Sequence, residues 1–408
     1  MIAELKNTRT SVALYGLAYL GVHLAFIPLL VLLLPRRVES IAPDDVTGTL
    51  SWLLLLGAIV AGAAHILAGI LSDRWIVNKP NRRGLIAIGT AALGLSYVFL
   101  AFAQDFLKLF LALVFFQAAL NCAFSPLGVL LTDHFPDRLK GRMGGIMNAA
   151  LPAASLTVVL LGWYFPSDGP EAVLLTGILA LVCIAPLLLF WPLGDVLKNR
   201  AEPELSDRET GKAAQTDFQI AWCARLAIQL GAAFVLGYIY VLLSRVMIAG
   251  PEGTSGNASN LLATLSAPAS VTAILATFLA GALSDKTGRR LPLALSAAAF
   301  AAGLAVLSEA TSLTTFMVGY AVFYVGLSAF LSIDTALVAQ LVSGSPRRGM
   351  LLGVMNLTNT LPAFIAPMLT LMAIQATTIE NVLGTLFLAC AAIAAISAVA
   401  ISFIKTVR

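Results

Sequence analysis

Charged side chains are scarce in this sequence: Asp, Glu, Lys and Arg together make up 11% of its 408 residues. Soluble domains carry about 25% of such residues, so a soluble globule of this length would have too little polar surface to face water. Apolar residues account for 59% of the chain, and the mean hydropathy is +0.91. The composition therefore argues against a soluble enzyme or binding domain and favours a single membrane-embedded unit.

The sequence also lacks the patterns that carry common chemistry. Its four cysteines lie inside apolar stretches without metal-ligand spacing, so neither a disulfide framework nor a zinc site is expected. No HExxH, GxSxG or phosphate-cradling glycine loop is present. We therefore expect no metal, no cofactor, no ATP-driven pumping and no nucleic-acid partner, and a membrane enzyme is disfavoured.

Long apolar segments are what the sequence has in abundance. A membrane-spanning helix needs about 20 apolar residues, and these segments run on without the alternation that barrel strands require. The first of them is too long for a signal peptide core and lacks a cleavage site. Twelve spanning helices are predicted, at roughly 11–34, 50–72, 84–103, 108–131, 144–164, 172–193, 218–248, 259–283, 291–308, 313–341, 350–374 and 381–404.

The distribution of basic residues predicts the orientation of these helices in the membrane. Most of the 25 Lys and Arg residues fall on one side of the predicted membrane, and the opposite loops hold only Arg36, Arg37 and Lys108. Because basic loops stay in the cytoplasm, we expect both termini to be cytoplasmic, in a multi-pass protein of the cytoplasmic (inner) membrane. A polar stretch, 195–217, is expected to be a mobile cytoplasmic linker. It separates two predicted bundles, 1–194 and 218–408.

The two halves resemble each other at corresponding places. The segment "GILSDR", which begins at Gly69, ends the second predicted helix, and "GALSDK", which begins at Gly281, ends the eighth. Likewise "GRMGGIMN" opens the fifth helix and "GMLLGVMN" opens the eleventh. Matching motifs at matching helix boundaries predict a duplicated six-helix unit, and parallel repeats of this kind are a known transporter plan.

The motif after the second and eighth helices resembles the signature loop of the major facilitator superfamily. The second copy fits throughout, whereas in the first Trp75 to Asn81 intervene before Arg82 and Arg83. That longer loop resembles the sugar–cation symporter branch, as does the stretch from Asp334 to Pro367. The resemblance implies an all-α integral membrane fold of twelve transmembrane helices, arranged as two pseudo-symmetric six-helix bundles.

An aspartate at a helix end, close to arginines of the next loop, can form charge-assisted hydrogen bonds that latch neighbouring helices. The resemblance implies that such latches hold the outward-open state. The alternative is that the basic residues only anchor the topology. The expected latch residues are Gly69, Asp73, Arg74, Arg82, Arg83, Gly281, Asp285, Lys286, Gly288, Arg289 and Arg290.

One acidic residue, Asp334, falls well inside a predicted span. An ionisable group there costs about 2.5–3.5 kcal/mol or more, so it is a functional candidate that needs a partner. Arg225 lies at a similar depth in the seventh helix, and we expect an Asp334–Arg225 pair or a protonatable Asp334. The alternative is a purely structural pair. His65, and less so His23, could also carry a coupling proton, although such histidines often serve packing alone.

Other positions bear on the transported solute and the coupling ion. No acid lies between Glu4 and Glu39, so the first helix lacks the carboxylate that many proton symporters use. None lies between Asp45 and Asp73, so the second helix lacks the paired carboxylates that bind sodium in melibiose-type carriers, and sodium coupling is disfavoured. The fifth helix lacks the GPxxGG run associated with drug–proton exchange, which disfavours an exporter. Polar residues at mid-depth could line a solute cavity, or could join helices. They are Gln117, Asn121, Tyr238, Tyr240, Tyr324, Asn356 and Asn359.

We therefore expect a monomeric secondary transporter that moves a small organic solute by alternating access, with proton-coupled uptake and a sugar as one fitting cargo. Its partners would be the solute, protons and the lipid bilayer. An exporter of a drug-like or lipid-like solute, and a non-transporting assembly factor on the same fold, stay open. The substitution Asp334→Asn separates a structural factor, which should tolerate it, from a coupled carrier, which should lose accumulation of the solute.

Overall fold

The structure, a computed structural model, describes residues 2–78, 81–134, 137–165, 167–191, 212–249, 258–342, 348–376 and 379–405. Within these ranges all regular structure is helical, which confirms the predicted all-α class. The long helices of the first half are α1 (Ile2–Pro28), α3 (Val46–Asn78), α4 (Arg83–Ala101), α5 (Phe106–His134), α6 (Asp137–Tyr164) and α7 (Pro170–Phe190). Those of the second half are α8 (Lys212–Ala249), α9 (Ala258–Thr287), α10 (Arg290–Ser308), α11 (Leu313–Val342), α12 (Arg348–Ala376) and α13 (Ile379–Ile401).

Eleven helical segments in the described part of the chain are long and apolar enough to cross a membrane, and α6 adds the shorter apolar stretch Ala149–Tyr164. Each predicted span matches one of these helices to within a few residues. The first span extends beyond its predicted end and runs over Thr10–Ile41. It continues past Pro28 through a π-helical segment, Leu29–Leu33, into α2 (Leu34–Ile41). Pro35, near the start of α2, has no backbone N–H and crowds the preceding turn. That turn is the π-helical segment, and its wider geometry keeps the helix continuous.

Arg36 and Arg37 lie in α2 rather than in a loop. The Arg36 guanidinium is buried and donates to the carbonyl of Phe165 over 2.7 Å, and Nε of Arg37 lies 3.2 Å from a carboxylate oxygen of Asp168. A short 3-10 turn, Pro43–Asp45, then leads into α3. The two arginines thus hold α2 against the segment between α6 and α7.

The chain divides into two compact units, Met1–Arg200 and Ala201–Arg408, which we call unit 1 and unit 2. Residues 195–211 of the predicted linker lie outside the described residues. Its remaining part, 212–217, is the start of α8, so the helix begins earlier than the apolar pattern indicates. Lys212, Ala213, Ala214 and Gln215 are good helix formers, which explains why the polar end of that stretch is helical.

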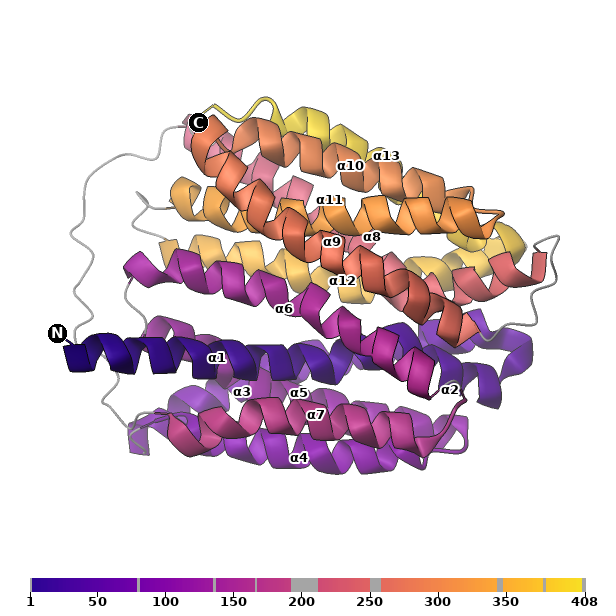
Figure 1. The fold of residues 1–408 in the computed structure, drawn as a ribbon, viewed down its shortest axis with the longest axis horizontal. Helices are drawn as coiled ribbons and strands as arrows, with labels where there is room; N and C mark the ends of the chain where they lie inside the picture. The colour runs from indigo at the N-terminus through magenta and orange to yellow at the C-terminus, as the bar shows by residue number, and fades with distance from the viewer. Residues whose placement is uncertain are drawn as a thin grey trace. The chain divides into compact units, whose positions relative to one another are not determined.

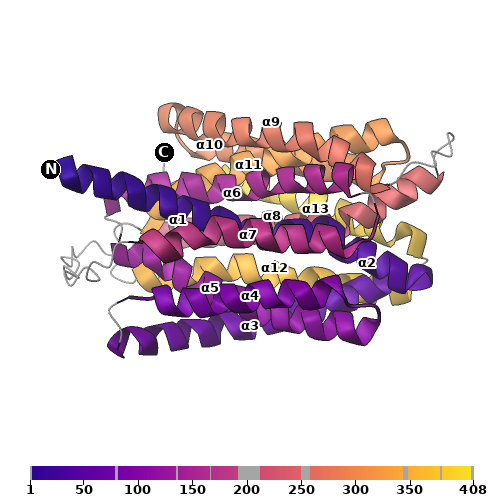
Figure 2. The same ribbon diagram turned by 60° about the horizontal axis from the view of Figure 1, so that its bottom comes forward.

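Helix packing follows the same plan inside each unit. In unit 1, α1 packs against α6 and α7, α5 against α3 and α4, and α4 against α7. In unit 2, α8 packs against α12 and α13, α11 against α9 and α10, and α10 against α13. Figure 1 and Figure 2 show α4 beside α5 in unit 1 and α10 beside α11 in unit 2. The repeated motifs therefore belong to two units with matching helix neighbours.

Glycine allows the closest of these helix approaches. A Cβ at Gly89 of α4 would overlap the backbone of Ala123 in α5. In unit 2, a Cβ at Gly303 of α10 would overlap the backbone of Phe323, and one at Gly326 of α11 that of Phe300. Small residues at such contacts let helix backbones pack closely in membranes.

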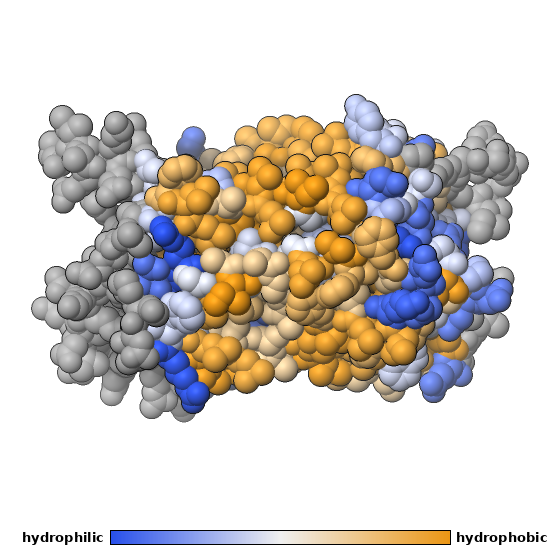
Figure 3. Space-filling view, turned by 90° about the horizontal axis from the view of Figure 1, so that it is seen from below, coloured by the Kyte–Doolittle hydropathy of each residue, from blue (hydrophilic) through white to orange (hydrophobic). Residues whose placement is uncertain are grey.

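Apolar side chains cover the outside of the helices. On the face drawn in Figure 3 they occupy the middle of the helices, and hydrophilic residues gather towards the helix ends. Large apolar side chains are exposed in both units, among them Ile66 at 66%, Leu189 at 68% and Ile396 at 68%. Soluble proteins rarely expose so much apolar surface, so these faces fit contact with lipid chains.

Candidate functional site

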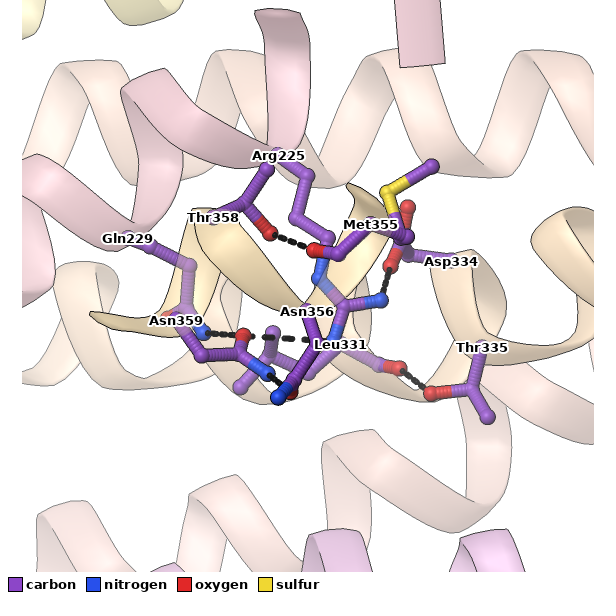
Figure 4. A network of polar contacts seen from close by, with 9 residues as sticks. All are labelled: Arg225, Gln229, Leu331, Asp334, Thr335, Met355, Asn356, Thr358 and Asn359. Atoms are coloured by element: carbon purple, nitrogen blue, oxygen red, sulfur yellow. Dashed lines mark hydrogen bonds and ion pairs between the residues drawn. The ribbon is translucent and has the colours of Figure 1, made fainter. Parts of the chain in front are cut away.

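The predicted pair between α8 and α11 is present. Nη1 of Arg225 lies 2.7 Å from Oδ2 of Asp334, as a charge-assisted hydrogen bond (Figure 4). The Asp334 side chain is 1% exposed and that of Arg225 is 16% exposed. Within the described residues, the other helices packed against α11, namely α9, α10 and α12, bring no further charged group within ion-pair distance of Asp334. Arg225 is therefore the counter-ion of Asp334 among the described residues.

Three amide side chains extend the pair on its accessible side. Nη2 of Arg225 donates to Oδ1 of Asn359 in α12 over 3.3 Å, and Nε2 of Gln229 donates to the same oxygen over 2.7 Å. Nδ2 of Asn359 then donates to Oδ1 of Asn356 over 3.0 Å. Figure 4 shows these side chains side by side, contributed by α8 and α12. We call Arg225, Gln229, Asp334, Asn356 and Asn359 the arginine–amide cluster.

The orientation of the amides in this cluster follows from the arginine. A guanidinium can only donate hydrogen bonds, so Asn359 must turn its oxygen towards Arg225. Its NH₂ group then faces Asn356, which must accept with its own oxygen. Gln229 must also present its NH₂ group. Hydrogen bonds from Arg225 and Gln229 therefore converge on the Asn359 oxygen, and one further bond leads from Asn359 to Asn356.

Neighbouring hydroxyls do not complete the ion pair. Thr335 donates to the carbonyl of Leu331 over 2.9 Å and Thr358 donates to that of Met355 over 2.7 Å. Oδ1 of Asp334 and Nε of Arg225 are both buried and have no hydrogen-bond partner among the described residues. A buried pair that served structure alone would be expected to have these positions satisfied, whereas here a single contact joins its two members.

Unit 1 holds a second polar group, between α3 and α5. Nδ1 of His65 lies 3.1 Å from Oδ1 of Asn121, and Nδ2 of Asn121 donates to the carbonyl of Gln117 over 2.9 Å. Because that carbonyl accepts from the NH₂ group, the Asn121 oxygen must face His65, and Nδ1 must carry the proton. The Gln117 contact uses its backbone, not its amide side chain.

An aromatic cluster centred on Phe124 lies beside this histidine. The Phe124 ring lies 6.1 Å from the ring of His65, 6.3 Å from that of His23 and 5.7 Å from that of Tyr19, measured between centroids. Nδ1 of His23 contacts the carbonyl of Tyr19 over 2.9 Å within α1. Both predicted histidines thus have one ring nitrogen hydrogen-bonded and pack on the same phenylalanine.

The glycines of the repeated motif lie at corresponding helix contacts. A Cβ at Gly69 would lie 3.4 Å from Oγ of Ser125 in α5, and one at Gly281 would lie 3.2 Å from Oγ of Ser332 in α11. Gly288, which follows α9, has a φ of 90°. That left-handed conformation strains any residue with a Cβ, so it accounts for the glycine at this position of the motif.

Two arginines of the motif contact the last helix of their own unit. Nη1 of Arg83 donates to the carbonyl of Trp191 at the end of α7 over 3.4 Å, and Nη1 of Arg290 donates to that of Ile404 after α13 over 2.8 Å. Arg82 is buried and donates to Oγ of Ser72 over 2.6 Å. These contacts latch helices within one unit.

The remaining latch candidates are placed as follows. Arg74 and Lys286 are exposed, and Arg289 precedes the first residue of α10. The side chains of Asp73 and Asp285 lie outside the described residues, so the predicted acid–arginine contacts stay a prediction.

The predicted cavity residues do not all gather in one place. Asn356 and Asn359 join the arginine–amide cluster, whereas Tyr238, Tyr240 and Tyr324 are buried among their own helices, at 0%, 4% and 1% exposed. Gln229 was missed by sequence analysis, although it follows Arg225 by one helical turn in "ARLAIQLG" and so shares its face. Among the described residues no group of three His, Cys, Asp or Glu side chains could hold a metal ion.

Comparisons with known proteins bear on this architecture. The family described as the Major Facilitator Superfamily matches residues 12–250 and 226–408. No curated protein matches the chain. Two solved structures of a bacterial homologue of the human lysosomal transporter Spinster share its fold, in inward-facing occupied and unoccupied conformations. Their TM-scores are 0.66 and 0.62, each at 16% identity, with 97% of this chain covered and 96% and 94% of theirs. The chain belongs to the Major Facilitator Superfamily, a family of membrane transporters.

Proposed function

We propose that this protein is a proton-coupled secondary transporter that takes up a small organic solute across the cytoplasmic membrane, with Asp334 as the proton-binding group. The observation that carries the proposal is the 2.7 Å contact between Arg225 and Asp334 inside two apolar spans. An intramembrane ion pair is costly to keep unless it has a use. Because the family transports solutes, coupling the movement of a proton to that of the solute would be such a use.

The pair couples the proton to the solute through competition for Arg225. While the guanidinium faces Asp334, the carboxylate stays charged. When a solute draws the guanidinium away, an unpaired carboxylate in this buried position is strongly unfavourable, and Asp334 takes a proton from water. Return of the guanidinium releases that proton. Oδ1 of Asp334 and Nε of Arg225 have no hydrogen-bond partner among the described residues. This supports such movement, since few other contacts have to be broken.

The loop motifs support alternating access in this proposal. Arg83 and Arg290 fix helix ends inside each unit, so each unit can move as a body. Asp73 and Asp285 are proposed to form the breakable latches at the cytoplasmic side, and their substitution would shift the balance between conformations without disturbing the arginine–amide cluster.

A proteoliposome assay tests the proposal. Purified protein is reconstituted with a pH-sensitive dye inside the vesicles, and sugars, polyols, amino acids and organic acids are added outside one at a time. We expect at least one solute to acidify the lumen. The variant Asp334→Asn should abolish this acidification and retain exchange of labelled solute for unlabelled solute.

The matched control is Asp105→Asn, which removes an exposed carboxylate outside the spans and should leave both activities intact. A non-transporting factor would move none of the sugars, polyols, amino acids or organic acids tested. An uncoupled carrier would move solute without acidification, and an Asp334→Asn protein that still acidified the lumen would show that another group binds the proton.

A further inference from the structure

The arginine–amide cluster has more hydrogen-bond donors than acceptors on its accessible side. Arg225 can only donate, and it fixes the amides so that Asn356, at the end of the chain of hydrogen bonds, has its NH₂ group unspent. Gln229 and Asn359 each keep a second N–H as well. Such a group of donors is satisfied by a ligand rich in acceptor oxygens.

Asp334 is more deeply buried than Arg225, so the two charges are not equally accessible to a ligand. The side chain of Asp334 is 1% exposed and that of Arg225 is 16% exposed, while Asn356 and Asn359 are exposed. A ligand that approaches the cluster therefore contacts the positive member and the amides. An anion is attracted there, and a cation is repelled by Arg225.

Charge balance during coupling leads to the same class of ligand. With the site empty, Arg225 and a charged Asp334 cancel. Once Asp334 has bound a proton, the positive charge of Arg225 remains, and an isolated charge in a membrane interior is expensive. A neutral solute would leave that charge unbalanced, whereas one negative charge on the solute restores neutrality. Coupling through this pair is thus electrically balanced only for an anion.

We propose that the solute is a small organic anion. Its carboxylate or phosphate oxygens bind Arg225, Gln229 and the amides of Asn356 and Asn359, and they replace Asp334 as the partner of Arg225. This inference rests on the proposed function and names its substrate class. One proton and one monoanion would then cross together, with no net charge moved.

Trp222 offers a binding signal that needs neither vesicles nor a gradient. It lies one turn before Arg225 in α8, and its indole N–H donates to the carbonyl of Val354 in α12 over 2.8 Å. The two helices that it joins are those that present the amides. Solute binding at the cluster should therefore change its fluorescence, and the Trp222→Phe variant identifies which part of the signal comes from this residue.

The probes are matched sets that differ in charge. One set is gluconate, glucitol and glucamine, with glucitol 6-phosphate to separate phosphate from carboxylate, and a second is benzoate, benzyl alcohol and benzylamine. We expect an anion in at least one set to change the Trp222 signal at tenfold lower concentration than its neutral and cationic counterparts. Asn359→Asp, which places a negative charge in the cluster, should weaken that anion at least tenfold, and Asn359→Gln should weaken it less.

Each outcome bears on one proposal. Binding of a neutral or cationic member in preference to its anion, or no response to any anion, would overturn the anion proposal. Uptake of a neutral solute with proton coupling would do the same and leave the proposed function intact. Conversely, anion binding that is abolished in Asn359→Asp but accompanied by no movement in proteoliposomes would contradict the transport proposal alone.

Discussion

The guanidinium of Arg290, at the start of α10, donates to the backbone carbonyl of Ile404, just after α13, over 2.8 Å. Arg83 makes the corresponding contact with Trp191 in unit 1. Carbonyls at or just beyond the end of a helix have no partner within the helix, and a basic side chain is a suitable donor for them. The repeated motif therefore has a structural part, which is separate from any role in gating.

Substitution Arg290→Ala should lower the stability of the protein by about 1–2 kcal/mol, because the Ile404 carbonyl loses a charged donor. The change is measurable as a lower midpoint of thermal unfolding in detergent and as faster amide hydrogen exchange at residues 401–405. The control Lys286→Ala removes an exposed charge of the same motif and should affect neither. Unchanged exchange at the end of α13 in Arg290→Ala would contradict a capping role.

Substitution Gly303→Ala should destabilise unit 2 by about 1–3 kcal/mol, because the new methyl group would overlap the backbone of Phe323 and separate α10 from α11. Gly128→Ala is the matched control: a Cβ at this helical glycine meets nothing within 4 Å, and alanine has the higher helix propensity. Thermal unfolding of the two variants should therefore shift in opposite directions, or shift only for Gly303→Ala. Equal shifts would show that close packing is not what requires glycine.

Stability should depend on pH through Asp105, which caps α5. Its Oδ1 accepts from the backbone N–H of Lys108 over 2.8 Å, and its Oδ2 lies 2.8 Å from Nζ of the same residue. The side-chain hydrogen bond from Lys108, followed by the backbone one, lowers the pKa of this carboxyl below its ordinary value. A lowered pKa stabilises the fold above the unfolded-state pKa, and that stabilisation is lost as the pH falls through the folded-state pKa.

The variant Asp105→Asn checks this prediction, since asparagine keeps the cap and loses the charge. Thermal midpoints of the two proteins should differ at neutral pH, with the wild type higher, and should converge in acid. The difference should be small because both side chains are exposed. A gap that stayed constant down to strongly acidic pH would mean that the carboxylate charge contributes nothing.

Much of the fold could be predicted because membrane helices leave a simple signal. Long apolar runs fix the number and place of the spans, and the repeated "GxLSD" motif indicates the duplicated unit. The start of α8 and the π-helical continuation after Pro28 were not predicted. They depend on the balance between local helix propensity and packing, which a hydropathy pattern does not report.

For the site, the useful signal was the scarcity of charged residues inside the predicted spans. A lone acid in an apolar span needs a partner, and Arg225 was the basic residue at matching depth, so the pair could be predicted from two helices far apart in the sequence. Gln229 and the order of the amide hydrogen bonds could not be predicted, because buried amides also serve packing and their roles depend on which helix faces turn together. Tyr238 shows the opposite case: its type suited a cavity, and its position on α8 buries it.

The two members of the ion pair should respond differently to removal. Arg225→Ala leaves a carboxylate that is 1% exposed without a counter-ion, and breaking a buried pair in this way costs about 3–5 kcal/mol. Asp334→Ala leaves a guanidinium that is partly exposed and still hydrogen-bonded to Asn359, so its cost should be lower. The combined variant Arg225→Met with Asp334→Leu removes both charges and should recover most of the thermal midpoint lost in Arg225→Ala, with no recovery of transport. Equal losses for the two single variants, or a combined variant no more stable than Arg225→Ala, would show that the pair is not the isolated, asymmetrically buried contact on which the proposed proton coupling depends.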